Sequence, residues 1–584
     1  MPSDLTRQSM PEDQWAPLNY KTAMASITAL GVHGQWVPPN EQRRLIAYRI
    51  YTGFKNNTAG KNIDTPDYEH RQYGDPATLN DLVVDGLLSE ELAFMCEGAG
   101  EEPAEPVLGD RPGDAAEGSP PAAVKLATLN QEQWDLTADE SVDGYEAALT
   151  AWRAGTKAQT WLDGWVRAEN VRAKIWEAER EFAVPLGDGV IVLGWNTRTN
   201  RTSVTVYPCD SYFPVIETDA REFPTKVHLA WEEPGPNGDS EFLHRVTYEL
   251  GDIVDDAGNV LTRSMPWGED TDQTCYITKK RWPIGAGGDW MTLDPTKATT
   301  IQAKTDLGFN FIPVIHIPNT PSTTFHYGRS MFALVTQLFD DIAAFDKDMA
   351  AAAALAATPM FAIEGGNLPA GYSVKAGAIW PLPPGAKPHK IDVSANLNPL
   401  LDYEQRLNAR LGTNSRVGPT VMGRVTATSQ ASGYRIKLEM TPFEQMIDMM
   451  RLVRASKYQL FFKLAQRISQ VGGALDAGAT VPVNIHFGPA VPTDVHAEAN
   501  LAAQLLSAGV VSRQTAVKML VQAGIPIDDA DEELARIVGE DFDGADDLSS
   551  AVGASAAAEY LGLAGPALPG LPGTDLPNVT LDGG

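Results

Sequence analysis

Nucleotide chemistry is the first function to test in this sequence, because Gly418 to Val425 has the glycine spacing of a phosphate-binding loop, GxxxxGK[ST]. In that motif the lysine contacts phosphates and the hydroxyl residue holds magnesium. Here Arg424 replaces the lysine and Val425 replaces the hydroxyl residue, and no clear strand precedes the loop. We therefore expect no nucleotide site in this segment.

Metal and hydrolytic chemistry also lack a convincing residue set. Asp340, Asp341, Asp346 and Asp348 are acidic neighbours, but at helical spacing they do not converge on one point, and a solvated or intersubunit face is the better interpretation. The nine histidines include no HxxxH pair. No motif singles out two carboxylates for glycoside hydrolysis. We expect no catalytic residue, metal or cofactor; a soluble acid-rich α+β enzyme, such as a hydrolase without a recognisable motif, stays open as the alternative.

Composition narrows the classes of protein. The chain has 584 residues, enough for two to four domains, and its 76 acidic against 46 basic residues give a net charge of −30. A protein that wraps DNA would be basic, so that class is disfavoured. The three cysteines are far apart and suggest neither disulfides nor a zinc site, which favours a reducing cytoplasm. We expect no signal peptide and no membrane segment.

A long amphipathic helix is predicted from Ser330 to Thr358, where Pro359 ends it. Its apolar residues recur at alternating spacings of four and three, which places them on one helical face. They are Met331, Val335, Leu338, Ile342, Phe345 and Met349. We expect this face to be buried against neighbouring elements or subunits, with Met331, Leu338, Ile342 and Phe345 as the candidates for assembly contacts.

Shorter elements surround this helix. A β-like segment over 360–388 and a helix over 396–411 follow it, and then a loop around Gly418, Pro419 and Gly423. Helices are predicted over 41–52, 79–94, 140–182 and 426–440; a further helix restarts at Thr441 with a capping box, so a kink is expected there. Three short helices are predicted within 493–540, with Gly509 and Gly524 where helices stop and Ser512 where one starts. Strands are predicted within 188–318, at 190–193, 203–206, 226–231 and 242–250, with a hairpin turn at 256–259.

Five segments resemble, in their order along residues 20–545, the portal proteins of tailed bacteriophages, in particular of phages that infect actinobacteria. Each is weak alone, and their order and spacing are the signal. The segments are Glu41–Tyr51, Pro185–Val190 continuing to Tyr212-Phe213-Pro214, Tyr327-Gly328-Arg329-Ser330, Ser429–Tyr434, and Ser507–Ser512 followed by Ala523–Pro526.

The resemblance implies an α+β portal fold, with a mixed α/β wing, a two-helix stem, a small β-containing clip, a kinked long helix and an α-helical crown. The corresponding ranges are 1–326 for the N-terminal wing region with a flexible acidic loop near 97–123, 327–358 for the first stem helix, 359–395 for the clip, 396–415 for the second stem helix, 416–428 for the tunnel loop, 429–490 for the kinked helix and wing return, 491–547 for the crown and 548–584 for a disordered tail.

The resemblance also implies a function and partners. Portals form a ring, usually a dodecamer, at one capsid vertex of the virion, and are assembled in the host cytoplasm. Double-stranded DNA passes through the channel during packaging and ejection. The implied partners are further copies of the chain, the terminase large subunit, a head-to-tail adaptor and the major capsid or scaffolding protein, with no membrane and no enzymatic activity.

A channel of this kind must let DNA slide without a deep binding minimum, so an acidic lining with few basic contacts is expected. The candidates for weak phosphate contacts are Arg406, Arg410, Arg416, Arg424, Lys375, Lys387 and Lys390. For any one of these residues, an ordinary solvated or intersubunit charge is the simpler interpretation.

Overall fold

The computed structural model divides into two compact units, Met1–Ala490 and Val491–Gly584. It describes residues 39–56, 74–89, 92–100, 102–103, 131–216, 224–234, 240–255, 257–283, 298–321, 326–357, 360–364, 387–391, 397–422, 433–490, 495–522 and 534. Most of the expected loop at 97–123, the expected tail at 548–584, Lys375 and Arg424 lie outside these ranges.

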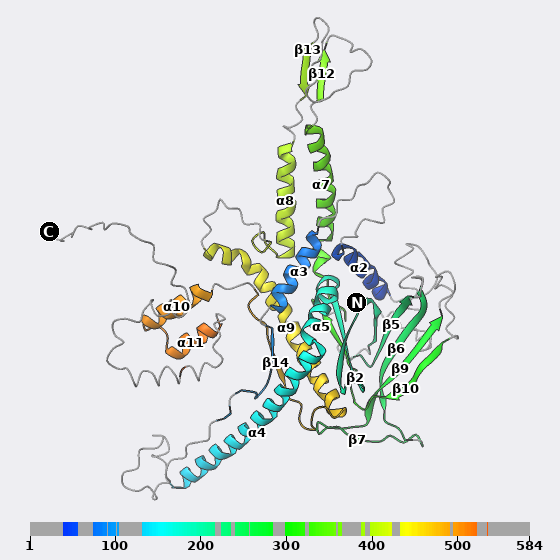
Figure 1. Ribbon diagram of the computed structural model, residues 1–584, viewed down its shortest axis with the longest axis vertical. Coiled ribbons are helices and arrows are strands. Elements are labelled where there is room, and N and C mark those ends of the chain that lie inside the picture. Colours follow the sequence, from blue (N-terminus) through cyan, green and yellow to red (C-terminus); the bar gives the residue numbers. More distant parts are fainter. Residues whose placement is uncertain are drawn as a thin grey trace, which may run out of the picture. The chain divides into compact units, whose positions relative to one another are not determined.

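Helices form much of the N-terminal part of the first unit (Figure 1). They are α2 (Pro39–Lys55), α3 (Asp75–Leu88), α4 (Gln131–Glu169) and α5 (Val171–Ala178). The helix predicted over 79–94 is too long, because α3 ends at Leu88 and Ala93–Cys96 forms strand β1, paired with β14 (Val483–His486). Phe94 and Cys96 are buried while Met95 is exposed, which is the period of two of a strand.

A π-helical turn lies between these helices and the sheets. After α5 the chain continues through the turn η2 (Glu179–Ala183) and the short helix α6 (Val184–Leu186). Gly187, at a φ of 109°, then ends the helix in the left-handed region that favours glycine. The strand β2 (Asp188–Asn196) begins at the next residue.

Two antiparallel sheets follow, in the strand orders β11–β2–β3 and β10–β9–β6–β5–β4. The strands are β2 (Asp188–Asn196), β3 (Arg201–Tyr207), β4 (Tyr212–Val215), β5 (Lys226–Pro234), β6 (Ser240–Asp252), β9 (Gln273–Pro283), β10 (Thr299–Asp306) and β11 (Val314–Pro318). The four predicted strand segments are confirmed within β2, β3, β5 and β6. The predicted turn is also confirmed, since Val254 and Val260 pair across it and the Asp255 carboxylate accepts the backbone N–H of Ala257 and Asn259. A smaller pair, β7 (Arg263–Ser264) and β8 (Asp270–Thr271), lies between β6 and β9 in the chain.

The core between the five-stranded sheet and the helices is aromatic. Trp282, Phe213 and Leu243 on the sheet pack with Tyr48 of α2 and Leu186 of α6. All three cysteines are free and buried. Burial raises the pKa of the Cys96 thiol to about 12, so this thiol is protonated at neutral pH.

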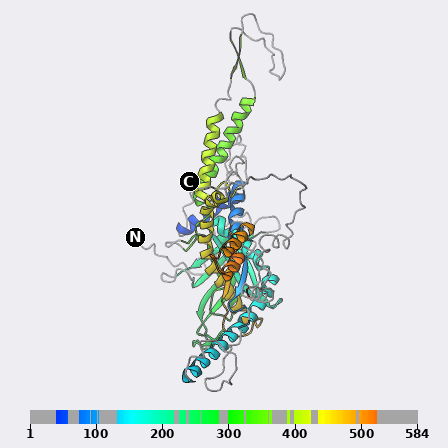
Figure 2. The same ribbon diagram turned by 90° about the vertical axis from the view of Figure 1, so that its left-hand side faces the viewer.

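Helices α7 (Thr336–Ala357) and α8 (Leu397–Ser415) pack side by side, and we call them the helix pair (Figures 1 and 2). The helix predicted from Ser330 to Thr358 is present, but its first turn is the separate 3₁₀ turn η6 (Met331–Leu334). Between the two helices the chain forms an antiparallel hairpin of β12 (Met360–Glu364) and β13 (Lys387–Ile391). This hairpin matches the short β-like segment that the sequence predicts there.

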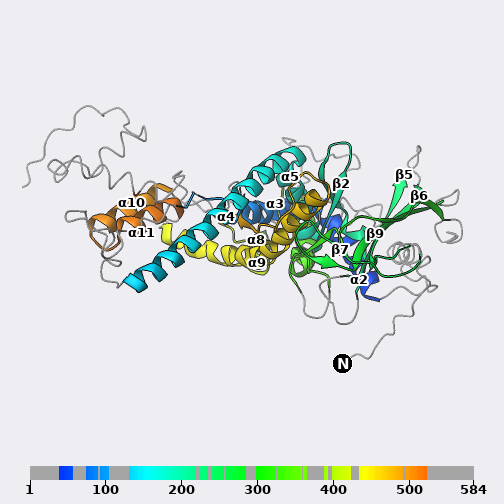
Figure 3. The ribbon, with the colours of Figure 1, turned by 90° about the horizontal axis from the view of Figure 1, so that it is seen from below.

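The helix α9 (Gly433–Val471) is continuous through Pro442. The predicted restart at Thr441 is therefore wrong, although Pro442 does remove the helical hydrogen bond to the carbonyl of Leu438, and Figures 1 and 3 show α9 bending. Burial decides the outcome: Phe443 packs so closely on α3 that a Cβ on Gly86 would lie 2.7 Å from its ring. Packing of the apolar face of α9 thus stabilises the helix enough to continue through Pro442.

The second unit contains α10 (Val495–Ser507) and α11 (Arg513–Gln522), which pack together. Gly509 has a φ of 66° after the first helix, and Ser512 accepts the backbone N–H of Thr515 at 3.2 Å at the start of the second. These are the stop and start that the sequence predicts; of the third predicted helix, the structure describes only Leu534. Within the described ranges, none of the helices combines the length and apolar character needed to cross a bilayer.

Candidate functional site

Two of the quoted segments, 185–190 and 327–330, meet at the base of the helix pair. We call this contact region the junction. The backbone N–H of Gly328 donates to Asp188 Oδ1 at 2.7 Å, and a Cβ on Gly328 would lie only 2.3 Å from the Gly187 carbonyl oxygen. Glycine at position 328 therefore permits a close backbone approach that a side chain would block.

Asp188 is the polar centre of the junction and is 1% exposed. Besides Gly328, its carboxylate accepts the Tyr48 hydroxyl of α2 and lies 2.6 Å from His316 Nε2 of β11. A carboxylate oxygen only accepts, so Nε2 carries the proton. One buried carboxylate thus joins a helix, two strands and the segment that leads into α7.

Aromatic and imidazole rings enclose this carboxylate–histidine pair. The ring of Tyr212 stacks on His316 and its hydroxyl lies 3.0 Å from His326 Nε2, while the two histidine rings are 4.4 Å apart. An Asp–His pair can orient a general base, but here His316 is only 8% exposed and already directs Nε2 to Asp188. The geometry fixes segments together and does not present a base to a substrate.

Ser330 starts the turn that leads into α7. Its hydroxyl donates to the Pro185 carbonyl and accepts the backbone N–H of Phe332 at 2.9 Å, which caps the 3₁₀ turn. Asn319 supports the same segment, because its side chain donates to the Arg329 carbonyl at 3.0 Å and its backbone N–H donates to the Gly187 carbonyl at 2.8 Å. The first turn of the helix pair is therefore fixed to the sheet through paired polar groups.

A buried ion pair connects the junction to α9. Arg454 and Glu179 are both fully buried, and the guanidinium donates to the two carboxylate oxygens at 3.1 and 2.9 Å. Arg454 also donates to the backbone carbonyl and side-chain oxygen of Asn319, both at 2.7 Å, and the Tyr458 hydroxyl donates to Glu179. Burial and the Glu179 carboxylate raise the pKa of Tyr458 well above its ordinary value, so the hydroxyl keeps its proton. We call Glu179, Asn319, Arg454 and Tyr458 the buried cluster.

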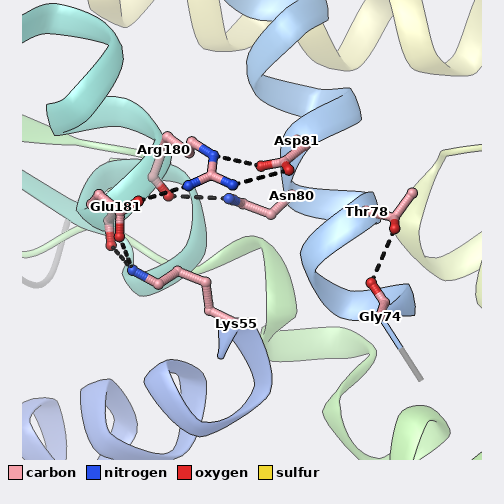
Figure 4. A network of polar contacts seen from close by, with 7 residues as sticks. All are labelled: Lys55, Gly74, Thr78, Asn80, Asp81, Arg180 and Glu181. Carbon is pink, nitrogen blue, oxygen red and sulfur yellow. Dashed lines mark hydrogen bonds and ion pairs between the residues drawn. The ribbon is translucent and has the colours of Figure 1, made fainter. Parts of the chain in front are cut away.

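The next residues of the π-helical turn point the other way, toward α2 and α3 (Figure 4). Arg180 donates to both carboxylate oxygens of Asp81, at 2.8 and 3.1 Å, and Lys55 pairs with Glu181. Asn80 donates to the Arg180 carbonyl at 3.0 Å. Burial alone would raise the pKa of Glu181, but hydrogen bonds from Lys55 and Arg180 lower it. Glu179 therefore points into the core and contacts α9, whereas Arg180 contacts α3 and Glu181 contacts α2. The turn links these three helices.

The four assembly candidates, Met331 in η6 and the other three on α7, have a more mixed environment than predicted. Ile342 is buried, whereas Met331, Leu338 and Phe345 are only partly buried. The centre of the buried face is shifted instead toward Phe332, Val335, Phe339 and Ile342. The reason is α2: its Tyr51 and Phe54 lie against Phe332 and Phe339, at ring-centroid distances of 6.4 and 6.1 Å.

The basic candidates for DNA contact are spread along the helix pair and its hairpin. Arg406 and Arg410 are exposed, four residues apart on α8; exposed Arg416 directly follows that helix with a left-handed φ of 59°. Lys387 and Lys390 lie in β13, where Lys387 is exposed. The structure therefore does not gather the described candidates into one patch.

The start of the predicted tunnel loop is packed rather than free. Val417 is fully buried, and Thr420 donates to Glu439 of α9 at 2.7 Å. Ser415 accepts the N–H of Val417 at 3.2 Å. Among the described residues 416–422, only Val417 is buried, so few of them belong to a core; residues after Met422 lie outside the described part of the chain.

Sequence reasoning missed the buried cluster and the role of Asp188. A signal existed for Arg454, because it occupies a position of the buried stripe formed by Phe443, Ile447, Met450, Tyr458, Phe461, Ala465 and Ile468. A charge inside such a stripe indicates a buried partner. No comparable signal singles out Glu179, whose inward direction depends on the π-helical turn. Within the described part of the chain, no group of three or more His, Cys, Asp and Glu side chains is arranged to hold a metal ion.

Comparison with known proteins gives distant likenesses only. No family model and no curated protein sequence matches the chain. A chain from the virion of a native gene transfer agent particle is 12% identical, with a TM-score of 0.35, and the match covers 87% of this chain and 99% of that one. A chain from the neck of an empty gene transfer agent particle is 15% identical, with a TM-score of 0.30, over 61% and 78% of the two chains. Likenesses at this level do not assign a function to this chain.

Proposed function

We propose that this chain is a ring-forming structural protein and not an enzyme. Within that class, we propose a phage-type portal protein, a dodecameric ring at one capsid vertex whose channel conducts double-stranded DNA during packaging and ejection. The observation that carries the proposal is a packed helix pair with a β-hairpin between its helices, fixed at its base to the sheets and to α9. Its elements follow the order that the portal resemblance implies.

The junction gives this layout a mechanical rationale. A channel must resist sideways force while DNA moves, so its helices need a stiff attachment. Here the segment before α7 is bonded to Asp188, Pro185 and Asn319, and Asn319 is bonded to Arg454 of α9. Buried, fully hydrogen-bonded polar networks hold one geometry because each lost bond leaves a costly unpaired group.

The proposed partners follow from the same assignment. The β12–β13 hairpin corresponds to the clip, which would contact the terminase large subunit during packaging and the head-to-tail adaptor afterwards. The sheet-containing region would contact the major capsid or scaffolding protein. The protein would belong to the virion and assemble in the host cytoplasm.

The enzyme alternative has one feature that resembles a catalytic group, the Asp188–His316 pair. Its burial and its engagement with Gly328 and Tyr48 favour a structural role. An acid-rich hydrolase also gives no reason for the hairpin-bearing helix pair. A measured turnover that survives His316→Gln would remove this pair from consideration, and monomers with turnover would favour the enzyme class.

Native mass measurement tests the proposal most directly. Purified protein should form rings of about twelve chains with an axial hole in negative-stain images, with and without magnesium. Compact monomers at every concentration would contradict the proposal.

DNA handling can be tested through the loop after α8. We expect that shortening the loop within residues 423–428, while keeping the buried Val417 and the bond from Thr420 to Glu439, leaves rings intact. Particles carrying the shortened loop should package or retain less DNA, measured as genome length per particle. Full-length DNA at wild-type levels would exclude a channel role for this loop.

A further inference from the structure

Two histidines are in ring contact at the junction. His316 of β11 and His326, which lies two residues before Gly328, stack with ring centroids 4.4 Å apart. The ring of Tyr212 in β4 stacks on both, at 5.2 and 6.0 Å, and the ring of Tyr327 contacts both edge-on, at 6.2 and 5.5 Å. Rings from both antiparallel sheets and from the segment before α7 therefore surround one pair of imidazoles.

The groups that face this pair come from several elements. They are Asp188 of β2, Tyr48 of α2, Tyr212 of β4, and Tyr327 and the exposed Arg329 of the segment itself. Asp188 lies 2.6 Å from His316 Nε2, so one proton added to the pair of imidazoles gives an ion pair without net charge. A first proton is therefore accommodated.

A second proton is resisted. It would place two like charges on rings 4.4 Å apart, beside a core that water does not screen, because His316 is only 8% exposed. The Tyr212 ring attracts a cation, but an uncharged ring does not remove the repulsion between two imidazolium rings. Solvated imidazoles each take up a proton between about pH 7.5 and 5.5. A chain with this contact open therefore binds more protons, and the closed contact loses stability as the pH falls.

The bond most directly affected is that of Gly328. Its backbone N–H donates to Asp188 at 2.7 Å, two residues after His326. The next bonds along the segment, from Arg329 and Ser330, are made to backbone carbonyls, which do not titrate in this range. The acid response is therefore expected before Arg329 and not after it.

We propose that His316 and His326 form an acid-sensitive latch. When both imidazoles are charged, residues 326–328 separate from β2 and β11, while Ser330 keeps the start of η6 in place. The helix pair then loses one of its attachments to the sheets without unfolding. The latch lies within one chain and goes beyond the ring proposed above, so its test does not require a ring.

Another histidine also responds to acid and has to be separated from the latch. Burial, together with Arg245 and Lys226, lowers the pKa of His228 well below its ordinary value. The next residue, Leu229, pairs with Tyr212 across β4 and β5, so His228 and Tyr212 point to opposite faces of the sheet. A loss of global stability in acid therefore does not identify the latch, whereas a local measurement does.

Hydrogen exchange of the full-length chain tests the latch, with rates corrected for the intrinsic effect of pH. Protection of the Gly328 N–H should fall at least about tenfold between about pH 7.5 and 5.5, the effect of one proton bound tenfold more tightly in the open state. The N–H of Phe332, which bonds to Ser330, should keep its protection.

Two variants and a matched control sharpen this measurement. His326→Gln cannot take up the proton and should keep Gly328 protected in acid. His326→Phe retains a ring against His316 and should behave in the same way, which covers a glutamine variant that does not fold. His244→Gln removes a histidine that pairs with Glu233 on the five-stranded sheet and should leave the response of Gly328 as in the unchanged chain.

Each outcome decides for or against the latch. Equal protection of Gly328 at both pH values in the unchanged chain overturns it, and so does a full acid response in both His326 variants. Parallel loss of protection at Gly328, Phe332 and the β2–β3 ladder would be global unfolding and also overturns it. Native mass judges the ring separately, so either proposal can fail while the other stands.

Discussion

The junction and the helix pair place their charges in opposite ways. In the buried cluster and at Asp188, charged or polar groups are enclosed and have partners within the chain. On the outer faces of α7 and α8, charged side chains are exposed, and Asp341, Arg406 and Arg410 have no ion-pair partner among the described residues. A buried charge must be paired to be tolerated, whereas an exposed charge can be left to solvent or to another molecule. The junction is therefore completed within the folded chain, whereas the charges on the outer faces of the helix pair stay available to solvent or to another molecule.

The largest effect is expected from removing one side of the buried ion pair. Arg454→Met leaves Glu179 buried without its cation and should lower the free energy of unfolding by about 3–5 kcal/mol. Chemical denaturation measures this loss. Arg467→Met is the matched control; it removes the pair with the exposed Glu269, a bond to Thr480 and a cation–π contact with Trp267, and should cost only about 1–2 kcal/mol.

A double variant sharpens that test. Glu179→Leu with Arg454→Met removes both charges and should recover part of the loss, but not all of it, because Tyr458 and Asn319 lose their partners. Equal losses in the free energy of unfolding for Arg454→Met and Arg467→Met would show that the buried cluster does not contribute more to stability than an ordinary ion pair.

A second test compares two phenylalanines on different faces of α7. Phe339 is buried against Phe54 of α2, so Phe339→Ala should cost about 3 kcal/mol of stability. Phe345 is partly exposed, so Phe345→Ala should cost about 1 kcal/mol in the monomer but weaken assembly more strongly. Denaturation of dilute monomer and native mass of concentrated protein separate the two effects. The reverse ranking of the monomer stabilities would contradict the assignment of folding and assembly faces.

Glycine substitution probes the closeness of the junction. Gly328→Ala brings a Cβ within 2.3 Å of the Gly187 carbonyl oxygen and should cost about 2 kcal/mol, seen as a lower denaturation midpoint. Gly164→Ala in α4 meets nothing within 4 Å and should be neutral or stabilise by about 0.5–1 kcal/mol. A neutral Gly328→Ala variant would mean that the two segments approach less closely than described.

The smallest expected effect is on pH dependence. The pKa of Glu181 is lower in the folded chain than its usual 4.5, so its stabilising contribution is complete above that value and is lost as the pH falls through the folded pKa. Glu181→Gln should therefore flatten the loss of stability below about pH 4.5 relative to the unchanged protein. Denaturation midpoints between pH 3 and 6 measure the difference. An unchanged pH profile would remove Glu181 from the acid response.

Several elements follow from sequence pattern alone. The alternating spacing of apolar residues from Met331 to Met349 predicts α7, and Pro359 predicts its end, because each depends on local period and backbone chemistry. Gly509 and Ser512 likewise mark a helix stop and start. The capping-box pattern at Thr441 fails for the complementary reason: burial of Phe443 against α3 outweighs a local signal for a new helix start.

Only the tertiary structure decides how these elements are joined. Asp188 and Gly328 are 140 residues apart and Glu179 and Arg454 are 275 apart, so no local rule pairs them. The buried face of α7 is likewise set by where α2 packs, which moves its centre to Phe332 and Phe339. The sequence by itself therefore predicts two helices, a β-like segment between them and the candidate charges, whereas the pairing of β12 with β13 comes from the structure. Folding selects which polar groups become buried partners, since the cost of an unpaired buried charge exists only once distant segments exclude water from it.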